Sequence, residues 1–139
     1  MSVEAAVKEP AVKSSVTGVL RKAAVLGAGT MGSRIAAHLA NAGLPVILLD
    51  IPAKEGPRGA IASQALDALK KSRPAAFYDP AYASRVTVGN FDDDLALLAG
   101  CDWVIEAVTE HLAIKQALLE RVVPHLKPDA ILTLSLIHI

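Results

Sequence analysis

The chain has 139 residues, enough for one domain with a hydrophobic core, and its apolar residues are mostly Ala, Val, Leu and Ile because only 4% are aromatic. That composition favours helices packed on a parallel sheet. Basic and acidic residues cancel at 14 each, which argues against nucleic acid or an anionic membrane surface as a partner. No apolar run approaches the ~20 residues of a membrane span, and the lone Cys101 has no disulfide partner. We therefore expect a cytoplasmic protein.

The N-terminal part of the chain predicts a tail and then a strand–helix–strand unit. Residues 1–20 mix Lys, Glu, Ser and Pro without a sustained period, which is typical of a flexible tail rather than of a signal peptide. From residue 21 the pattern predicts a buried strand at 22–26, an amphipathic helix at 30–42 and a second buried strand at 45–49. Gly43 is expected to end the helix, and Asp50 to close the second strand.

Strands and helices continue to alternate after a Pro- and Gly-rich loop at 51–59. The expected elements are a helix from Ile61 to Lys71, a third strand at 86–88, a short helix at 92–98, a fourth strand at 103–108, a helix over 112–122 and a fifth strand from Ile131. The carboxylates of residues 92–94 are expected to cap the short helix and face solvent. This alternation predicts an α/β fold with a doubly wound parallel sheet of about five strands in the order 3-2-1-4-5.

A glycine-rich motif joins the first strand to the first helix. Residues 27–32 have the spacing G-x-G-x-x-G, and we expect cofactor contacts from all of them: Gly27, Ala28, Gly29, Thr30, Met31 and Gly32. The first glycine permits a tight turn, the second lets the backbone approach a pyrophosphate, and the third lets helix and strand pack closely. Because the motif follows a strand and opens a helix, whose N-terminus attracts phosphate, it indicates the first β-α-β unit of a Rossmann-type dinucleotide-binding domain.

Asp50 indicates which dinucleotide binds. A carboxylate at the end of the second strand accepts hydrogen bonds from the adenosine ribose hydroxyls, whereas a 2′-phosphate would meet like charge. No arginine follows Asp50 immediately, since Arg58 lies beyond a Pro/Gly loop. The expected cofactor is therefore NAD rather than NADP. FAD stays an alternative on these residues alone, because FAD-binding Rossmann domains open with the same features.

Three stretches, at 21–33, 35–51 and 102–110, resemble the NAD-binding domain of the 3-hydroxyacyl-CoA dehydrogenases of fatty-acid β-oxidation. The most specific part is I-E-A-V-T-E at 105–110. The likeness is greatest to the large bacterial enzymes that fuse this dehydrogenase to an enoyl-CoA hydratase module. It implies a bacterial cytoplasmic oxidoreductase, a homo-oligomer at full length, that oxidises (S)-3-hydroxyacyl-CoA to 3-ketoacyl-CoA with NAD.

The resemblance also assigns residues beyond the glycine motif. It implies that Glu110 and Lys115 reach the nicotinamide-side ribose, and that the backbone around Ala107 and Val108 lines the cofactor crevice. From the residues alone, Lys115 could instead be a solvated helix lysine and Glu110 a carboxylate at a helix start. The histidines share no metal-ligand spacing, so we expect no metal site.

The C-terminal part of the sequence lacks the residues that carry out the family's reaction. The catalytic histidine, its glutamate partner and a Ser-Asn-Thr-Ser segment have no counterpart, so no catalytic residue is expected here. Leu-Ser-Leu-Ile-His-Ile at 134–139 matches the translation of a transposon-end adapter used in sequencing libraries, so we interpret residues 21–133 as a truncated NAD-binding domain. The chain would bind NAD without catalysis. The alternatives are a stand-alone nucleotide-sensing module and a dehydrogenase of a β-hydroxy acid without CoA.

Overall fold

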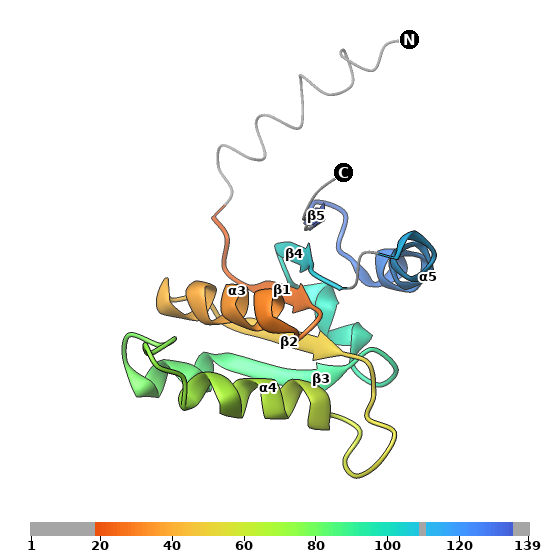
Figure 1. The fold of residues 1–139 in the computed structure, drawn as a ribbon. Helices are drawn as coiled ribbons and strands as arrows, with labels where there is room; N and C mark the ends of the chain where they lie inside the picture. The colour runs from red at the N-terminus through yellow and green to blue at the C-terminus, as the bar shows by residue number, and fades with distance from the viewer. Residues whose placement is uncertain (1–18, 109–110, 135–139) are drawn as a thin grey trace.

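The computed structural model describes residues 19–108 and 111–134. Its centre is a five-stranded parallel sheet in the order β3-β2-β1-β4-β5 (Figure 1). The strands are β1 (Ala23–Leu26), β2 (Val46–Asp50), β3 (Val86–Asn90), β4 (Trp103–Glu106) and β5 (Ile131–Leu134). The α-helices are α3 (Thr30–Asn41), α4 (Ala60–Lys70) and α5 (Leu112–Val122), and the 3-10 helices are η1 (Pro80–Arg85), η2 (Leu95–Gly100) and η3 (Val123–His125).

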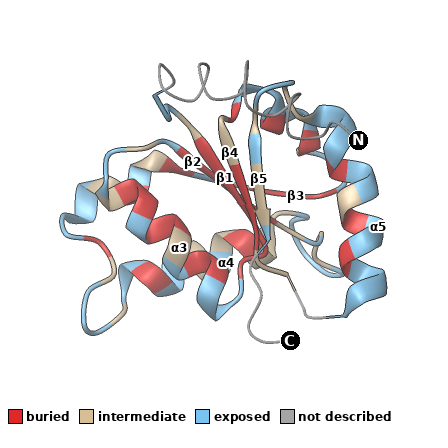
Figure 2. Cartoon of the chain, turned by 90° about the horizontal axis from the view of Figure 1, so that it is seen from above, coloured by how far each residue is buried: buried red, intermediate tan, exposed pale blue. Residues whose placement is uncertain are grey.

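Helices cover both faces of the sheet, with α3 and α4 on one face and α5 on the other (Figure 2). Successive residues of β1 point to opposite faces. Val25 packs in the core that includes α3 and α4, whereas Leu26 packs in the core that includes Leu118 of α5. Burial on both faces explains why the strands read as continuous apolar runs. No helix within the described ranges combines the length and apolar character needed to cross a bilayer.

The predicted fold class and strand order are confirmed, whereas the short helix predicted at 92–98 is a 3-10 helix, η2, that begins three residues later, at Leu95. A turn follows β3 and leads into η2, and the side chains of this turn bond to its own backbone. Asn90 Oδ1 accepts the N–H groups of Asp92 and Asp93, each at 2.9 Å. Asp94 Oδ2 in turn accepts the Asn90 N–H at 2.9 Å. Such side-chain hydrogen bonds offer the backbone an alternative to the helix, so these carboxylates do not cap one.

The carboxyl ends of β1, β2 and β4 meet at one edge of the sheet. Leu26, the last residue of β1, is in register with Leu49 of β2 and with Glu106 of β4. The ladder continues past the strands, since Gly27 N–H donates to Leu49 O at 2.7 Å and Ala107 N–H donates to Leu26 O at 2.8 Å. The chain moves from β1 to opposite sides to form β2 and β4. This is the switch point at which ligands bind in open α/β sheets.

Candidate dinucleotide site

The glycines of the 27–32 motif have different surroundings. A Cβ at Gly32 would lie 1.8 Å from the Gly27 carbonyl oxygen, and a Cβ at Gly27 would lie 2.7 Å from the Ala107 carbonyl oxygen. Gly27 also has a φ of +108°, a conformation that L side chains rarely adopt. Both positions therefore require glycine because three backbone segments approach closely. Gly29 differs, since no described atom outside residues 28–30 lies within 4 Å of the position that its Cβ would take.

The open space at Gly29 adjoins the start of α3. The first amides of an α-helix have no acceptor four residues back and carry partial positive charge. Among the described residues, no side chain caps the start of α3, and its first turn holds no acidic residue. A helix start with no capping side chain and no acidic residue in its own first turn is suited to a pyrophosphate.

Asp50 lies at the end of β2, beside the glycine turn, and its carboxylate holds two backbone amides. Its Oδ2 accepts the Ala28 N–H at 2.7 Å, and its Oδ1 accepts the Ile51 N–H at 2.6 Å. Each carboxylate oxygen can accept a second hydrogen bond, so ribose hydroxyls can still bind to Asp50. Asp50 thus fixes the turn that would cradle the cofactor. Sequence reasoning missed this second role, because a side-chain bond to a backbone amide 22 residues away leaves no local pattern.

A cavity of about 540 Å³ opens at this edge of the sheet. The sequence-predicted residues in its walls are Gly27, Gly29, Asp50, Ala107 and Val108. The other residues in its walls are Ile51, Phe91, Ile114, Ala117, Leu118 and Arg121. Apolar side chains thus surround a few polar groups at the strand ends, as is usual in ligand pockets. The second set was missed because it comes from separate segments that only the fold brings together.

A buried ion pair connects the end of β4 to α5. Glu106 is fully buried, and its Oε1 accepts a hydrogen bond from Lys115 Nζ at 2.9 Å. Its Oε2 accepts the N–H of Val108, a residue of the cavity wall, at 2.6 Å. Lys115 is itself buried, so the alternative of a solvated helix lysine is wrong. Its contact with the nicotinamide-side ribose stays a prediction. Glu106 could have been suspected from the sequence as the one charged residue of an apolar strand.

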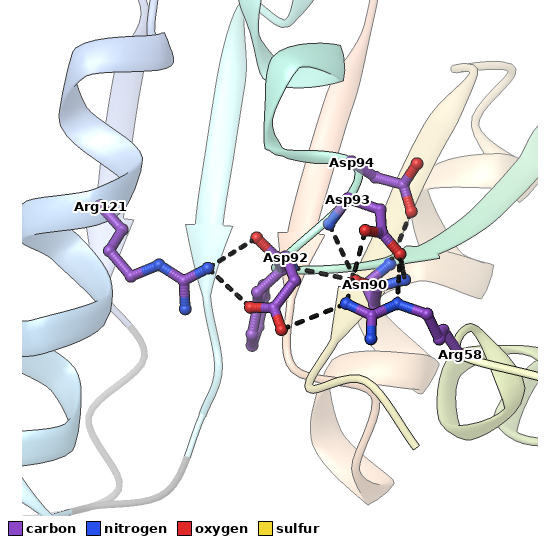
Figure 3. Close-up of polar contacts among 7 residues, drawn as sticks. Arg58, Asn90, Asp92, Asp93, Asp94 and Arg121 are labelled. Atoms are coloured by element: carbon purple, nitrogen blue, oxygen red, sulfur yellow. Dashed lines mark hydrogen bonds and ion pairs between the residues drawn. The ribbon is translucent and has the colours of Figure 1, made fainter. Parts of the chain in front are cut away.

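Arg58, Asp92, Asp93 and Arg121 form a network of ion pairs on the rim of the cavity (Figure 3). Arg58 Nε lies 2.7 Å from Asp93 Oδ2, and its Nη2 lies 3.4 Å from Asp92 Oδ2. Arg121 Nη2 donates to Asp92 Oδ1 at 2.8 Å. The hydrogen bond from Arg58, with a further one from Asn90, lowers the pKa of the Asp93 carboxyl below its usual value. Sequence analysis did not predict this arginine–aspartate network.

The remaining predicted residues lie around the start of α3. Ala28 and Thr30 line, with Gly29, a second hollow of about 380 Å³ between α3 and α4. Met31, in the first turn of α3, is exposed. Glu110 lies outside the described residues. Within the described ranges, no group of three or more His, Cys, Asp or Glu could hold a metal ion.

Comparisons with known proteins agree with this geometry. Residues 22–136 match the family described as "3-hydroxyacyl-CoA dehydrogenase, NAD binding domain". A probable 3-hydroxyacyl-CoA dehydrogenase of Deinococcus radiodurans is 48% identical over 115 residues, which are 82% of this chain and 33% of that protein. A putative fatty acid oxidation complex trifunctional enzyme of Rickettsia felis is 41% identical over 114 residues, which are 81% of this chain and 16% of that protein.

Solved structures show the same relationship. The crystal structure of 3-hydroxybutyryl-CoA dehydrogenase from Escherichia coli K12 matches with a TM-score of 0.70 and 27% sequence identity. The match covers 88% of this chain and 26% of that chain. The present chain thus spans a third or less of the length of each of these relatives, in the part that the family description assigns to NAD.

Proposed function

Because the chain belongs to the family of 3-hydroxyacyl-CoA dehydrogenase NAD-binding domains, we propose that it holds the cofactor of an enzyme that oxidises (S)-3-hydroxyacyl-CoA to 3-ketoacyl-CoA in fatty-acid β-oxidation. NAD⁺ supplies the hydride acceptor of such a reaction when bound. The chain spans a third or less of the length of these relatives, so the substrate and the reaction are themselves part of the proposal. The chain itself is proposed to bind NAD without catalysis.

The observation that carries the proposal is the open position at Gly29 beside the carboxylate of Asp50. A pyrophosphate at Gly29 would face the amides at the start of α3, and the adenosine ribose would face Asp50. The backbone of Ala107 and Val108 would line the opposite wall. These residues therefore fit NAD in shape and in charge.

Titration calorimetry with NAD⁺ tests this proposal on the 139-residue chain. Gly29→Ala places a methyl group where the pyrophosphate would lie while touching no described atom, so it is expected to weaken NAD⁺ binding by about tenfold or more without changing the melting temperature. Gly100→Ala is the matched control, because its Cβ would meet only Lys22 Nζ at 4.0 Å at the other end of the sheet. Tighter binding of FAD than of NAD⁺, or equal binding by the Gly29 variant, contradicts the proposal.

The wider setting of the parent enzyme is part of the same proposal. An acyl-CoA substrate is consistent with the fatty acid oxidation named in the description of the Rickettsia relative. A homo-oligomeric state and a bacterial cytoplasmic location stay predictions from the family resemblance. The interpretation of residues 134–139 as adapter sequence stays a prediction. The codons for these residues in a clone prepared without that adapter test it.

A further inference from the structure

We propose that Asp92 and Asp93 set the preference for NAD over NADP by holding Arg58 away from the position that a 2′-phosphate would occupy beside Asp50. This inference rests on the proposed NAD-binding function. It assigns a role to the arginine–aspartate network, which neither the glycine motif nor the family resemblance explains. The expected ligand contact of Asp50 is unchanged by it.

The network lies next to Asp50 because of the sheet register. Asp50 of β2 is paired with Asn90 of β3, and neighbouring strands are ~4.8 Å apart. The Oδ2 atom of Asp93 accepts hydrogen bonds from both Asn90 Nδ2, at 3.0 Å, and Arg58 Nε, at 2.7 Å. Asp93 therefore connects the Arg58 guanidinium to Asn90, the residue that pairs with Asp50 across the two strands. Figure 3 shows Arg58 turned toward Asn90 and the two aspartates.

Ion pairs, rather than packing, hold Arg58 in this place. Its side chain is 55% exposed, and those of Asp92 and Asp93 are 43% and 50% exposed. A backbone hydrogen bond from Ala53 N–H to Arg58 O, at 3.0 Å, closes the loop and keeps the base of the side chain near β2. If the carboxylates lost their charge, the guanidinium would keep its position on the loop but lose its strongest partners. It could then turn toward Asp50.

The chemistry of the two cofactors makes this difference selective. The adenosine ribose of NAD offers neutral hydroxyls to Asp50, whereas NADP adds a phosphate that needs a cation, and a planar guanidinium binds phosphate through two parallel hydrogen bonds. In the folded chain, Asp92 and Asp93 form ion pairs with the Arg58 guanidinium and add negative charge to the same rim. The carboxylates therefore disfavour NADP binding in two ways. They repel its 2′-phosphate, and they keep Arg58 from pairing with that phosphate.

The test compares the ratio of the NADP⁺ and NAD⁺ dissociation constants in the wild-type chain and in a double variant, Asp92→Asn with Asp93→Asn. We expect the ratio to fall by about tenfold, because a neutral amide holds a guanidinium less strongly than a carboxylate does. Adding Arg58→Ala to the double variant should restore most of the wild-type ratio. Adding Lys54→Ala, which removes the other cation of the same loop, should leave the ratio low.

Two further comparisons make the result specific. Asp67→Asn with Asp129→Asn removes the same number of exposed charges away from the rim and should leave the ratio unchanged. Circular dichroism and retained NAD⁺ binding show that each variant is folded. An unchanged ratio in the double variant, or a gain that persists without Arg58, overturns this inference while leaving NAD binding intact. Failure of the wild-type chain to bind either nucleotide overturns the proposed function, and this inference with it.

Discussion

Glu106 and Lys115 form an ion pair at the point where β4 ends, with 2.9 Å between Oε1 and Nζ and with both side chains almost completely buried. The same carboxylate holds the Val108 N–H at 2.6 Å. A buried charge is costly unless it is paired and hydrogen-bonded. The pair therefore couples the position of α5 to the backbone that lines the proposed cofactor cavity.

Removing one partner of this pair is expected to destabilise the fold strongly. Glu106→Gln takes the carboxylate away from a buried ammonium, and Lys115→Met takes the ammonium away from a buried carboxylate. Each change should lower the free energy of unfolding by about 3–5 kcal/mol, measured by urea denaturation. The double variant should lose less than the sum of the two single losses, since neither charge is then left without the other.

Lys70→Met is the matched control for the buried lysine. Lys70 pairs with Asp67 at 3.8 Å on the exposed face of α4, and such surface pairs contribute about 0–1 kcal/mol. Strictly additive losses at Glu106 and Lys115, or losses no larger than that of Lys70→Met, would show that the buried pair does not couple β4 to α5.

Substitutions at two glycines of the 27–32 motif are expected to differ in their effect on stability. Gly32→Ala places a Cβ 1.8 Å from the Gly27 carbonyl oxygen, and backbone must move to relieve the overlap. We expect a loss of about 3 kcal/mol or more in the free energy of unfolding. Gly29→Ala should leave that free energy nearly unchanged, because its Cβ meets no described atom within 4 Å. Equal melting temperatures for the two variants would refute this distinction.

The parts of the fold that follow from local pattern were predictable from the sequence. Apolar runs, the helix periodicity and the 27–32 motif place β1, α3 and β2 close to their observed bounds. The turn after β3 was not predictable, because the Asn90 side chain bonds to the N–H groups of Asp92 and Asp93 where a helix was expected to begin. Residue propensities do not indicate when side-chain hydrogen bonds to the backbone will replace the hydrogen bonds of a helix.

The candidate site was predictable only where it lies near one motif. Gly27, Gly29 and Asp50 belong to a single β-α-β unit, so spacing alone connects them. Arg121 and Phe91 enter the same cavity from α5 and from the end of β3, and their proximity depends on the order of the strands. The burial of Lys115 likewise depends on how α5 packs, which one sequence does not specify.

Asp50 is expected to affect stability even without cofactor. Asp50→Ala removes the acceptors of the Ala28 and Ile51 amides, and the Ala28 amide is buried with its residue. Leaving a buried donor without a partner costs about 1–3 kcal/mol, so the unliganded variant should unfold at lower urea concentration. Hydrogen exchange at the Ala28 amide should also become faster. Unchanged exchange there, together with lost NAD⁺ binding, would confine Asp50 to a ligand role.

The pH dependence of stability is expected to depend on Asp102, at the opposite end of the sheet. A hydrogen bond from Lys127 Nζ and those from the Arg21 and Lys22 N–H groups, at 2.7 and 3.1 Å, lower the pKa of the Asp102 carboxyl. A carboxyl with a lowered pKa stabilises the folded state above its unfolded pKa of about 3.9, and this stabilisation is lost as the pH falls through the lower folded value.

Asp102→Asn should therefore flatten the acid limb of the stability curve. Urea titrations from about pH 6 to about pH 2 should show a smaller fall in the free energy of unfolding for the variant than for the wild type, because the variant has no proton to take up at this position. Asp67→Asn, which removes an exposed carboxylate with a single lysine partner, should leave the acid limb nearly as steep as in the wild type. The pKa of Lys127 is raised by the same contact, so its contribution persists until the pH rises above about 10. An acid limb that is equally steep with and without Asp102 would mean that the contacts of this carboxylate do not set the response of the fold to acid.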